Sequence, residues 1–433
     1  MGSEFEEYRV QDLIAQGKLA IGDGYRAKNN ELARVGLPFA RAGNINDGFH
    51  FDDCDCFPEV DLSRVGDKIS QPGDVVFTSK GTVGRFAFVR SDTPRFVYSP
   101  QLCYWRALDA ELIDSRYLFY WMCGPDFLGQ YKGVAGQTDM AEYVSLADQR
   151  SMRLTLPPID RQRAVARILG ALDDKIESNR RMSQALESMA RALFKSWFVD
   201  FDPVRAKAEG RDPGLPGPLA DLLPDSFEDS EAGEVPKGWR LFGLDEIADF
   251  LNGLALQRFP ANDGRTLPVI KIAQLHAGNT EGADEASAGI PSDYVVQDGD
   301  VLFSWSGSLS VELWCGGPGA LNQHLFKVTS RLFPKWFYYH WTRQHLVDFS
   351  EIAAGKATTM GHIQRHHLSD AKVVVPAAAV LEAVDSVCGP ITEASWRIRV
   401  QSRDLAGIRD SLLPVLLAGS TDVDSTIESA VGL

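Results

Sequence analysis

The sequence lacks long hydrophobic runs. No stretch of the 433-residue chain approaches the roughly 18 consecutive apolar residues that a membrane-spanning helix needs. The longest apolar run, Val373–Leu381, is short and is interrupted by Pro376. A charged segment followed by an apolar one, as in a secretory leader, is also missing from the first residues. We therefore expect a cytoplasmic protein that has no membrane partner.

Cysteine is scarce as well. The chain has six cysteines and no CxxC pair, and Cys54 and Cys56 lie too close together for an ordinary disulfide. This usage is typical of a reduced compartment. His362 and His366 have the i, i+4 spacing of a zinc-binding helix, but the Glu of the HExxH motif is absent. We expect no metal site in this chain.

Motifs of common catalytic sites are missing too. The sequence contains no GxxxxGK[ST] phosphate loop, no GxGxxG turn that opens a helix after a strand, and no GxSxG nucleophile turn. It also lacks an Asn/Asp-Pro-Pro-aromatic motif, with which an amino-group methyltransferase would hold a flipped base. Asp173-Asp174-Lys175 resembles a string of nuclease carboxylates, but it lies in a helical segment, where a solvated face explains it better. We expect the chain to catalyse no reaction by itself and to bind no cofactor.

Negative charge is concentrated in one segment. The formal net charge is −15, and residues 200–236 contribute −7 of it, with 3 Lys and Arg against 10 Asp and Glu. The large segments on either side are nearly balanced, so basic patches can exist on them. A protein that grips DNA alone is normally more basic. If DNA is the ligand, we expect partner subunits to supply much of the positive surface.

Two segments of the chain repeat one another. Residues 157–197 align without a gap with residues 376–416 at a constant offset of 219, so that Pro157 falls on Pro376. Each copy follows a domain-sized stretch. The repeated unit is therefore a globular domain followed by a long helix, used twice.

Apolar residues recur three or four apart in both copies, which is the spacing of a coiled-coil seam. A helix of about 40 residues is about 60 Å long, more than one domain of this size can cover. We predict that the two helices pair antiparallel, with polar Asn179 helping to fix the register. The alternative is two amphipathic helices that each pack only on their own domain. The residues predicted for the seam and for partner contacts are Leu169, Leu172, Ile176, Asn179, Leu186, Met189, Leu193, Trp197, Ile391, Ile398, Leu405, Ile408, Leu412 and Leu416.

The two domains share a loose sequence pattern. Gln71–Thr78 matches Gln297–Ser304, Pro100–Leu102 matches Asn322–His324, and a helix is predicted at Arg116–Gly129. The fold class is α+β: two α/β domains separated by an antiparallel pair of long coiled-coil helices, with a pseudo-twofold internal repeat. The expected divisions are a first domain at 1–156, a helix at 157–200, an acidic Pro/Gly-rich linker at 201–236, a second domain at 237–375, a second helix at 376–418 and a tail at 419–433.

Loops in both domains combine Lys or Arg with Asn, Gln and Gly. Asn and Gln pair with adenine and Arg with guanine, whereas Lys holds phosphates. One such loop alone is more often an ordinary surface turn, but recurrence at equivalent places in two repeated domains favours DNA binding. The candidates are Arg26, Lys28, Arg41, Asn44, Lys80, Gln101, Gln137, Thr138, Gln257, Arg258, Lys271, Gln274, Ser306, Gln323, Lys356, Thr358 and Thr359.

The central segment resembles a known family. Its most particular strings are Pro157-Pro158 with Gln162-Arg163, Leu172–Ile176, and Phe194–Pro203. Together they resemble the central region of specificity (S) subunits of type I restriction-modification systems. The order of domains and helices fits that family over essentially the whole chain. The second helix departs from the pattern, because it lacks the Gln-Arg and Phe-Lys-Ser-Trp-Phe strings.

This resemblance implies a non-catalytic subunit with two target recognition domains, each reading one half of a gapped double-stranded DNA target. The helices would dock two methyltransferase (M) subunits and set the spacer. S-adenosylmethionine would belong to the M subunits, and ATP and Mg to restriction (R) subunits. The alternative is a coiled-coil scaffold that does not read DNA sequence.

Overall fold

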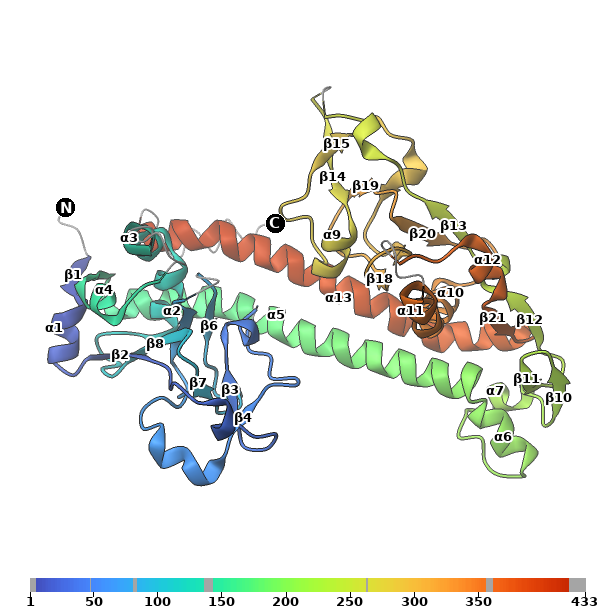
Figure 1. Ribbon diagram of the computed structural model, residues 1–433, viewed down its shortest axis with the longest axis horizontal. Helices are drawn as coiled ribbons and strands as arrows, with labels where there is room; N and C mark the ends of the chain where they lie inside the picture. Colours follow the sequence, from blue (N-terminus) through green and yellow to red (C-terminus); the bar gives the residue numbers. More distant parts are fainter. Residues whose placement is uncertain are drawn as a thin grey trace. The chain divides into compact units, whose positions relative to one another are not determined.

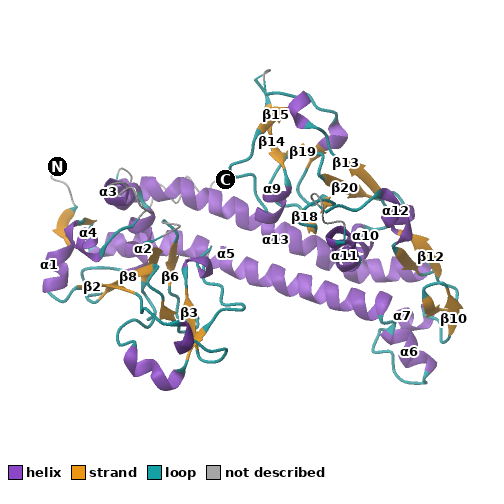
Figure 2. Ribbon diagram, in the orientation of Figure 1, coloured by secondary structure: helices purple, strands orange, loops and turns teal. Residues whose placement is uncertain are grey.

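A computed structural model of the chain describes residues 5–46, 48–80, 84–135, 143–261, 264–355 and 361–419. It divides into two compact units, the first formed by residues 1–174 with 406–433 and the second by residues 175–405. Each unit contains one α/β domain and a part of both long helices, α5 (Ile159–Phe194) and α13 (Ala378–Ala418). Figure 2 shows these helices in purple and the strands of the domains in orange. None of the helices that the structure describes is long and apolar enough to cross a membrane.

The first unit holds the strands and short helices that precede α5 in the chain (Figure 1). Asp114 caps α2, because its carboxylate accepts hydrogen bonds from the backbone N–H groups of Arg116 (3.0 Å) and Tyr117 (2.9 Å). The helix predicted at Arg116–Gly129 is two helices, divided at Gly124 because Pro125 starts a new one. The elements are β1 (Glu6–Arg9), α1 (Val10–Ala15), β2 (Leu19–Asp23), β3 (Leu37–Ala40), β4 (Cys56–Phe57), β5 (Val75–Thr78), β6 (Phe86–Phe88), β7 (Val97–Tyr98), β8 (Leu102–Ala107), α2 (Ser115–Cys123), α3 (Pro125–Ala135), α4 (Leu146–Ser151) and β9 (Arg153–Leu156).

The second unit begins within α5 and ends within α13. A π-helical turn, Lys195–Val199, follows α5 directly. The elements between the long helices are α6 (Asp202–Ala208), α7 (Gly217–Leu222), β10 (Phe227–Ser230), β11 (Gly233–Pro236), β12 (Arg240–Gly243), α8 (Leu244–Ile247), β13 (Asp249–Asn252), β14 (Thr266–Ile270), α9 (Ile272–Ala277), β15 (Glu285–Ser287), β16 (Val295–Val296), β17 (Val301–Ser304), β18 (Ser310–Leu313), β19 (Gly319–Leu321), β20 (Leu325–Thr329), α10 (Lys335–Gln344), α11 (Leu346–Ala354), α12 (Arg365–Asp370) and β21 (Lys372–Val375).

The two domains have the same sheet topology. The first contains sheets of order β2-β8-β5-β6, β4-β3-β7 and β1-β9, and the second contains β13-β20-β17-β18, β15-β14-β19-β16 and β12-β21. The parallel pair β3–β7 has its counterpart in the parallel pair β14–β19, while the other corresponding pairs are antiparallel. Within the part of the chain that the structure describes, the one difference is β16, in whose place the first domain has only an isolated antiparallel bridge between Ile69 and Val97.

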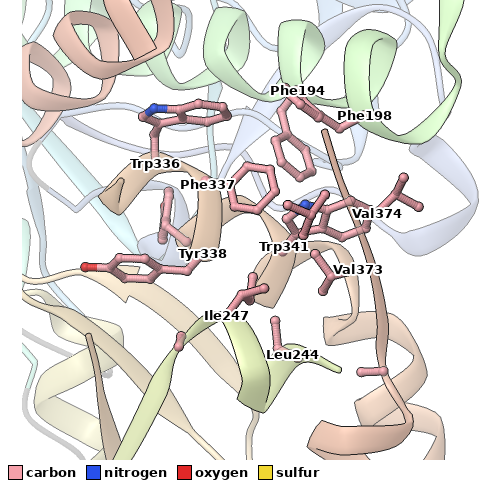
Figure 3. Packing of buried hydrophobic residues seen from close by; sticks show 14 of the residues in the cluster. Phe194, Phe198, Leu244, Ile247, Trp336, Phe337, Tyr338, Trp341, Val373 and Val374 are labelled. Carbon is pink, nitrogen blue, oxygen red and sulfur yellow. The ribbon is translucent and has the colours of Figure 1, made fainter. Parts of the chain in front are cut away.

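Each domain has its own apolar core. In the second unit, aromatic residues of α10 pack against Phe194 at the end of α5, against Phe198 in the π-helical turn that follows it, and against Val373 of β21 (Figure 3). Phe198 is 1% exposed, and its ring centroid lies 5.6 Å from that of Trp336. Core packing of this kind, rather than helix propensity, holds α5 against the second domain.

The segment 201–236, which its composition marks as a linker, contains α6, α7, β10 and β11. Its few apolar side chains, including Phe201, Val204 and Leu219, belong to the core around Trp239. Most of its acidic residues remain on the surface. The segment is ordered in the structure because these apolar side chains have a core to enter, which composition alone does not reveal.

In the first unit, α5 and α13 run antiparallel and contact each other. Leu416 near the end of α13 is buried in the same cluster as Val165 and Leu169 near the start of α5. Further along, Arg409 of α13 forms an ion pair of 2.9 Å with Asp173 of α5. Tyr120 of α2 donates a hydrogen bond of 2.5 Å to the same carboxylate. The domain therefore contacts both helices.

In the second unit the helices also run antiparallel. Asn179 is 3% exposed and donates a hydrogen bond of 2.9 Å to Gln401 of α13. Glu187 and Arg399 form an ion pair of 3.1 Å across the two helices. Ser183 donates a hydrogen bond of 3.0 Å to a backbone carbonyl of α13, which brings the helices close together.

The register of the seam in this part of α5 differs from the prediction. Met189, predicted to lie in the seam, is 52% exposed, whereas the smaller Ser183 and Ala190 are buried. Small side chains let two helices approach closely, and a search for the largest apolar residues overlooks them. In the first unit Ile408 is likewise 42% exposed, although it was predicted to lie in the seam.

Candidate nucleic-acid interface

Four loops of the first domain meet at one place. Three of them adjoin strands β2, β5 and β8 of the four-stranded sheet, which we call the main sheet, and the fourth follows β3. The loop after β2 reaches the end of β7, where Tyr25 N–H donates to Tyr98 O at 2.7 Å. Gln101, just before β8, accepts a hydrogen bond from Ala42 N–H (3.2 Å) in the loop after β3. The backbone carbonyl of Gln101 accepts from Ser79 N–H (2.9 Å), after β5. Residues far apart in the sequence therefore form one surface.

The predicted site residues of the first domain that the structure describes lie in or beside these loops, with different surroundings. Lys80 is exposed, and its ammonium lies 5.9 Å from the ring centroid of Tyr143. Arg41 forms an ion pair of 2.7 Å with Asp55. Asn44 accepts a hydrogen bond from Arg41 N–H at 2.8 Å and so shapes its own loop. Arg26, in the loop after β2, is exposed.

Lys28 starts the short helical turn after that loop. Its backbone N–H donates a hydrogen bond of 2.7 Å to the carboxylate of Glu31. This hydrogen bond lowers the pKa of Glu31, and Arg64 contributes in the same direction. The Lys28 side chain is exposed, but it lies beside an acidic residue, so the local charge is partly balanced.

Corresponding loops meet in the second domain. Leu254 N–H, after β13, donates to Leu321 O at 3.0 Å, and Gln323 N–H donates back to Leu254 O at 3.0 Å. Lys271 lies after β14, as Arg41 lies after β3, and its N–H donates to Gln274 at 3.3 Å. This contact repeats the one between Arg41 and Asn44. The loop scaffold is thus the same in both domains.

The predicted DNA-binding residues of the second domain differ in how far their side chains are exposed to solvent. Gln257 and Arg258 are exposed on the turn after β13. Gln274 is only 9% exposed and serves its own turn, so it supports the loop instead of offering a contact. Ser306 is 4% exposed and interacts through its hydroxyl with Nδ1 of His324 at 3.1 Å. Gln323 contacts the other ring nitrogen of His324 at 3.3 Å.

Lys271 is exposed and forms an ion pair with Asp284. The remaining candidates, Gln137, Thr138, Lys356, Thr358 and Thr359, lie outside the described residues.

Two glycines hold the loops together by close backbone approach. A Cβ atom on Gly24 would lie 1.9 Å from Ser99 O, and one on Gly253 would lie 2.2 Å from Asn322 O. We predict that Gly24→Ala destabilises the first unit by about 2 kcal/mol or more, since the clash is with backbone that must move. Urea unfolding measures this change. Gly129→Ala is the matched control: its Cβ meets nothing within 4 Å, and alanine favours the helix it occupies.

Sequence reasoning missed three side chains of this surface. Tyr143, 47% exposed, pairs with Lys80 in an isolated β-bridge, and His362 pairs with Ser306 in the same way. The third is His324, which lies beside Ser306 in the second domain. No local sequence motif could have indicated these two bridges, because the residues of each pair are more than 50 positions apart in the chain.

Electrostatics at this surface depend on few groups. Partial burial raises the pKa of Tyr143, and nearby Cys103 and Asp23 act in the same direction, so its phenol stays protonated and can donate a hydrogen bond. Within the described part of the chain, no three His, Cys, Asp or Glu side chains gather in a way that could hold a metal ion. With the exposed ammonium of Lys80 beside the Tyr143 phenol, the surface of the first domain can offer positive charge and hydrogen-bond donors.

Comparisons with known proteins agree with this reading of the fold. Residues 2–188 match the family model described as the type I restriction modification DNA specificity domain. The chain is similar to the type I restriction enzyme HindI specificity subunit of Haemophilus influenzae, with 22% identity over 96% of this chain and 99% of that protein. It is also similar to the MjaIX specificity subunit of Methanocaldococcus jannaschii, with 22% identity over 82% and 79% of the two chains.

A solved structure supports the fold over the full length. The crystal structure of the type I restriction-modification system S subunit from M. genitalium superimposes with a TM-score of 0.58 at 12% identity, covering 95% of this chain and 96% of that one. The family match, together with the fold, identifies a protein that contains a DNA specificity domain. Residues 2–188 thus match a type I restriction modification DNA specificity domain, and over most of its length the chain is similar in sequence to specificity subunits of type I restriction enzymes.

Proposed function

We propose that this chain is the DNA-reading subunit of a type I restriction-modification complex, in which each domain reads one half of a bipartite, gapped target. The observation that carries the proposal is the repeated surface: two domains of one topology present equivalent loops from equivalent strands. A scaffold protein needs no such repetition of loop geometry. Differences between the side chains on the two surfaces then supply two different half-sequences.

The long helices are proposed as the docking surface for two methyltransferase (M) subunits and as the spacer between the half-sites. Antiparallel pairing of two equivalent helices supports a pseudo-twofold axis, which matches two identical M subunits. Met182 and Met189 of α5 are each 52% exposed, as an apolar docking face requires. S-adenosylmethionine is assigned to the M subunits, and ATP and Mg to the R subunits, so the chain itself supplies recognition only.

Binding by the assembled complex tests this function. We expect the chain, co-expressed with its M subunits, to bind a duplex carrying its bipartite target at least 100-fold more tightly than a shuffled duplex, in the range of specific over non-specific binding. Methylome sequencing of cells that express the complex identifies that target. Equal binding to the two duplexes would favour the alternative, a coiled-coil scaffold without sequence reading.

Exchange of one domain tests the division of labour. Replacing residues 1–156 with the first domain of another specificity subunit is expected to change one half of the methylated motif and to leave the other half intact. The graft must keep Tyr120 and Arg116, since these side chains bind Asp173 and Asp174 of α5. A motif that changes in both halves would contradict the modular reading.

A further inference from the structure

Two loop positions carry the same backbone pairing in both domains but different side chains. Lys80 and Tyr143 form an antiparallel β-bridge in the first domain, and Ser306 and His362 form the same bridge in the second. The next hydrogen bond is also repeated, since Val144 N–H donates to Ser79 O at 3.1 Å and its counterpart, Ile363 N–H, donates to Trp305 O at 3.1 Å. The backbone platform is thus constant while the chemistry on it changes.

A third equivalent position holds Gln101 in the first domain and His324 in the second. The carbonyl of Gln101 accepts from Ser79 N–H at 2.9 Å, and that of His324 accepts from Trp305 N–H at 3.4 Å. The following strands, β8 and β20, start at the next residue in each case. All three positions therefore form one small surface in each domain, at the end of the main sheet.

The surface of the first domain offers mainly donors. The side-chain oxygen of Gln101 is engaged by Ala42 N–H at 3.2 Å, so the amide has its N–H groups to offer. The Lys80 ammonium has donors only. A guanine presents two acceptors, N7 and O6, in the major groove. Donors from two neighbouring loops match that pattern, and they do not match a base edge that itself donates.

The surface of the second domain combines a donor with an acceptor. The amide nitrogen of Gln323 can only donate, so Nε2 of His324 accepts from it at 3.3 Å. Nδ1 of His324 then carries the proton and donates to the Ser306 hydroxyl at 3.1 Å. The ring holds Gln323 in place, and the amide keeps its oxygen and a second N–H. Adenine, with N7 as acceptor and the N6 amino group as donor, matches that pair.

We propose that Lys80 and Gln101 read a guanine in the first half of the DNA target, and that Gln323, held by His324, reads an adenine in the second half. This inference rests on the proposed function and adds the residues that determine one base pair in each half. In this arrangement His324 is a positioning residue, since it acts through Gln323.

The test uses the complex of the full chain with its M subunits and duplexes in which each base pair of the methylated target is changed in turn. Lys80→Ala and Gln101→Ala are expected to relax the preference at one G·C pair of the first half by about 10-fold, and to leave the second half unchanged. Gln323→Ala relaxes one A·T pair of the second half. His324→Ala gives the same relaxation at the same pair, which a merely structural role would not produce. Lys132→Ala and Gln344→Ala are matched controls on exposed positions of the same domains.

The outcomes separate this inference from the proposed function. A wild-type complex with no sequence preference would remove the proposed function itself. A wild-type complex with a clear bipartite target, but variants that weaken binding to every sequence alike, would show that these side chains hold phosphates, and would overturn the inference alone. Variants that behave like the two controls would overturn it as well.

Discussion

A complex whose helices α5 and α13 are each lengthened by seven residues, after Ile176 and after Leu405, is expected to bind the same two half-sequences at a longer spacing. Seven residues add about 10 Å to each helix, which equals about three base-pair rises. A heptad nearly preserves the face of each helix. These positions leave the domain contacts intact, because the first domain reaches Asp174 on α5 and the second reaches Arg403 on α13, where Arg403 pairs with Asp298.

The measurement is binding to duplexes whose spacer differs in single-base steps. The original spacing is expected to lose at least 100-fold in affinity, since only one half-site can then be engaged, and a longer spacing should restore it. Lengthening α5 alone is the control, because it moves Asn179 out of register with Gln401 and should weaken binding at every spacing. Altered half-sequences in the double insertion would contradict the proposal that the helices set the spacer.

Truncation of Phe198 should have the largest effect on stability. This ring is 1% exposed and packs against Phe194, Trp239, Trp336 and Phe337, with ring centroids between 5.5 and 5.9 Å away. Phe198→Ala removes these contacts and leaves a cavity, which costs about 3–5 kcal/mol of the free energy of unfolding. Figure 3 shows that the ring lies where the end of α5 meets the second domain.

Denaturant unfolding followed by tryptophan fluorescence measures this loss. Leu332→Ala is the control, since Leu332 is 80% exposed and its truncation should change stability by less than about 0.5 kcal/mol. An equally small change for Phe198→Ala would show that this core does not hold the second unit together. A separate transition of the first unit, unchanged in the variant, would agree with two compact units.

The sequence predicted the helices well because their signal is long and periodic. A pattern sustained over ten turns outweighs any local exception, so α5 and α13 were expected within a few residues of their observed ends. Asn179 was predicted for the seam because it is a polar residue among apolar ones, and in the structure it is buried and donates a hydrogen bond to Gln401 of α13. The prediction for Met189 was wrong, because hydrophobicity favours it over Ser183 and Ala190, and only the close approach of the two helices selects the smaller side chains.

Loop equivalence was harder to predict. The sequence pattern just before β8 and β20 aligned Gln101 with Gln323. The backbone hydrogen bonds instead make Gln101 equivalent to His324, one residue later. A one-residue shift changes which side chain faces the ligand, and no short motif records it. Tyr143 and His362 carry no motif either, since each meets its partner across a separation of more than 50 residues.

The amino-acid sequence by itself determined that the chain is built twice from a domain and a long helix, because repetition and helical period are properties of residue order. It also indicated the resemblance to type I specificity subunits, through the strings around Phe194–Pro203. Only the tertiary structure decided which side chains share a surface, which face of α5 meets α13, and that residues 201–236 pack into a core. Those outcomes depend on contacts between residues distant in the chain, and local patterns do not encode such contacts.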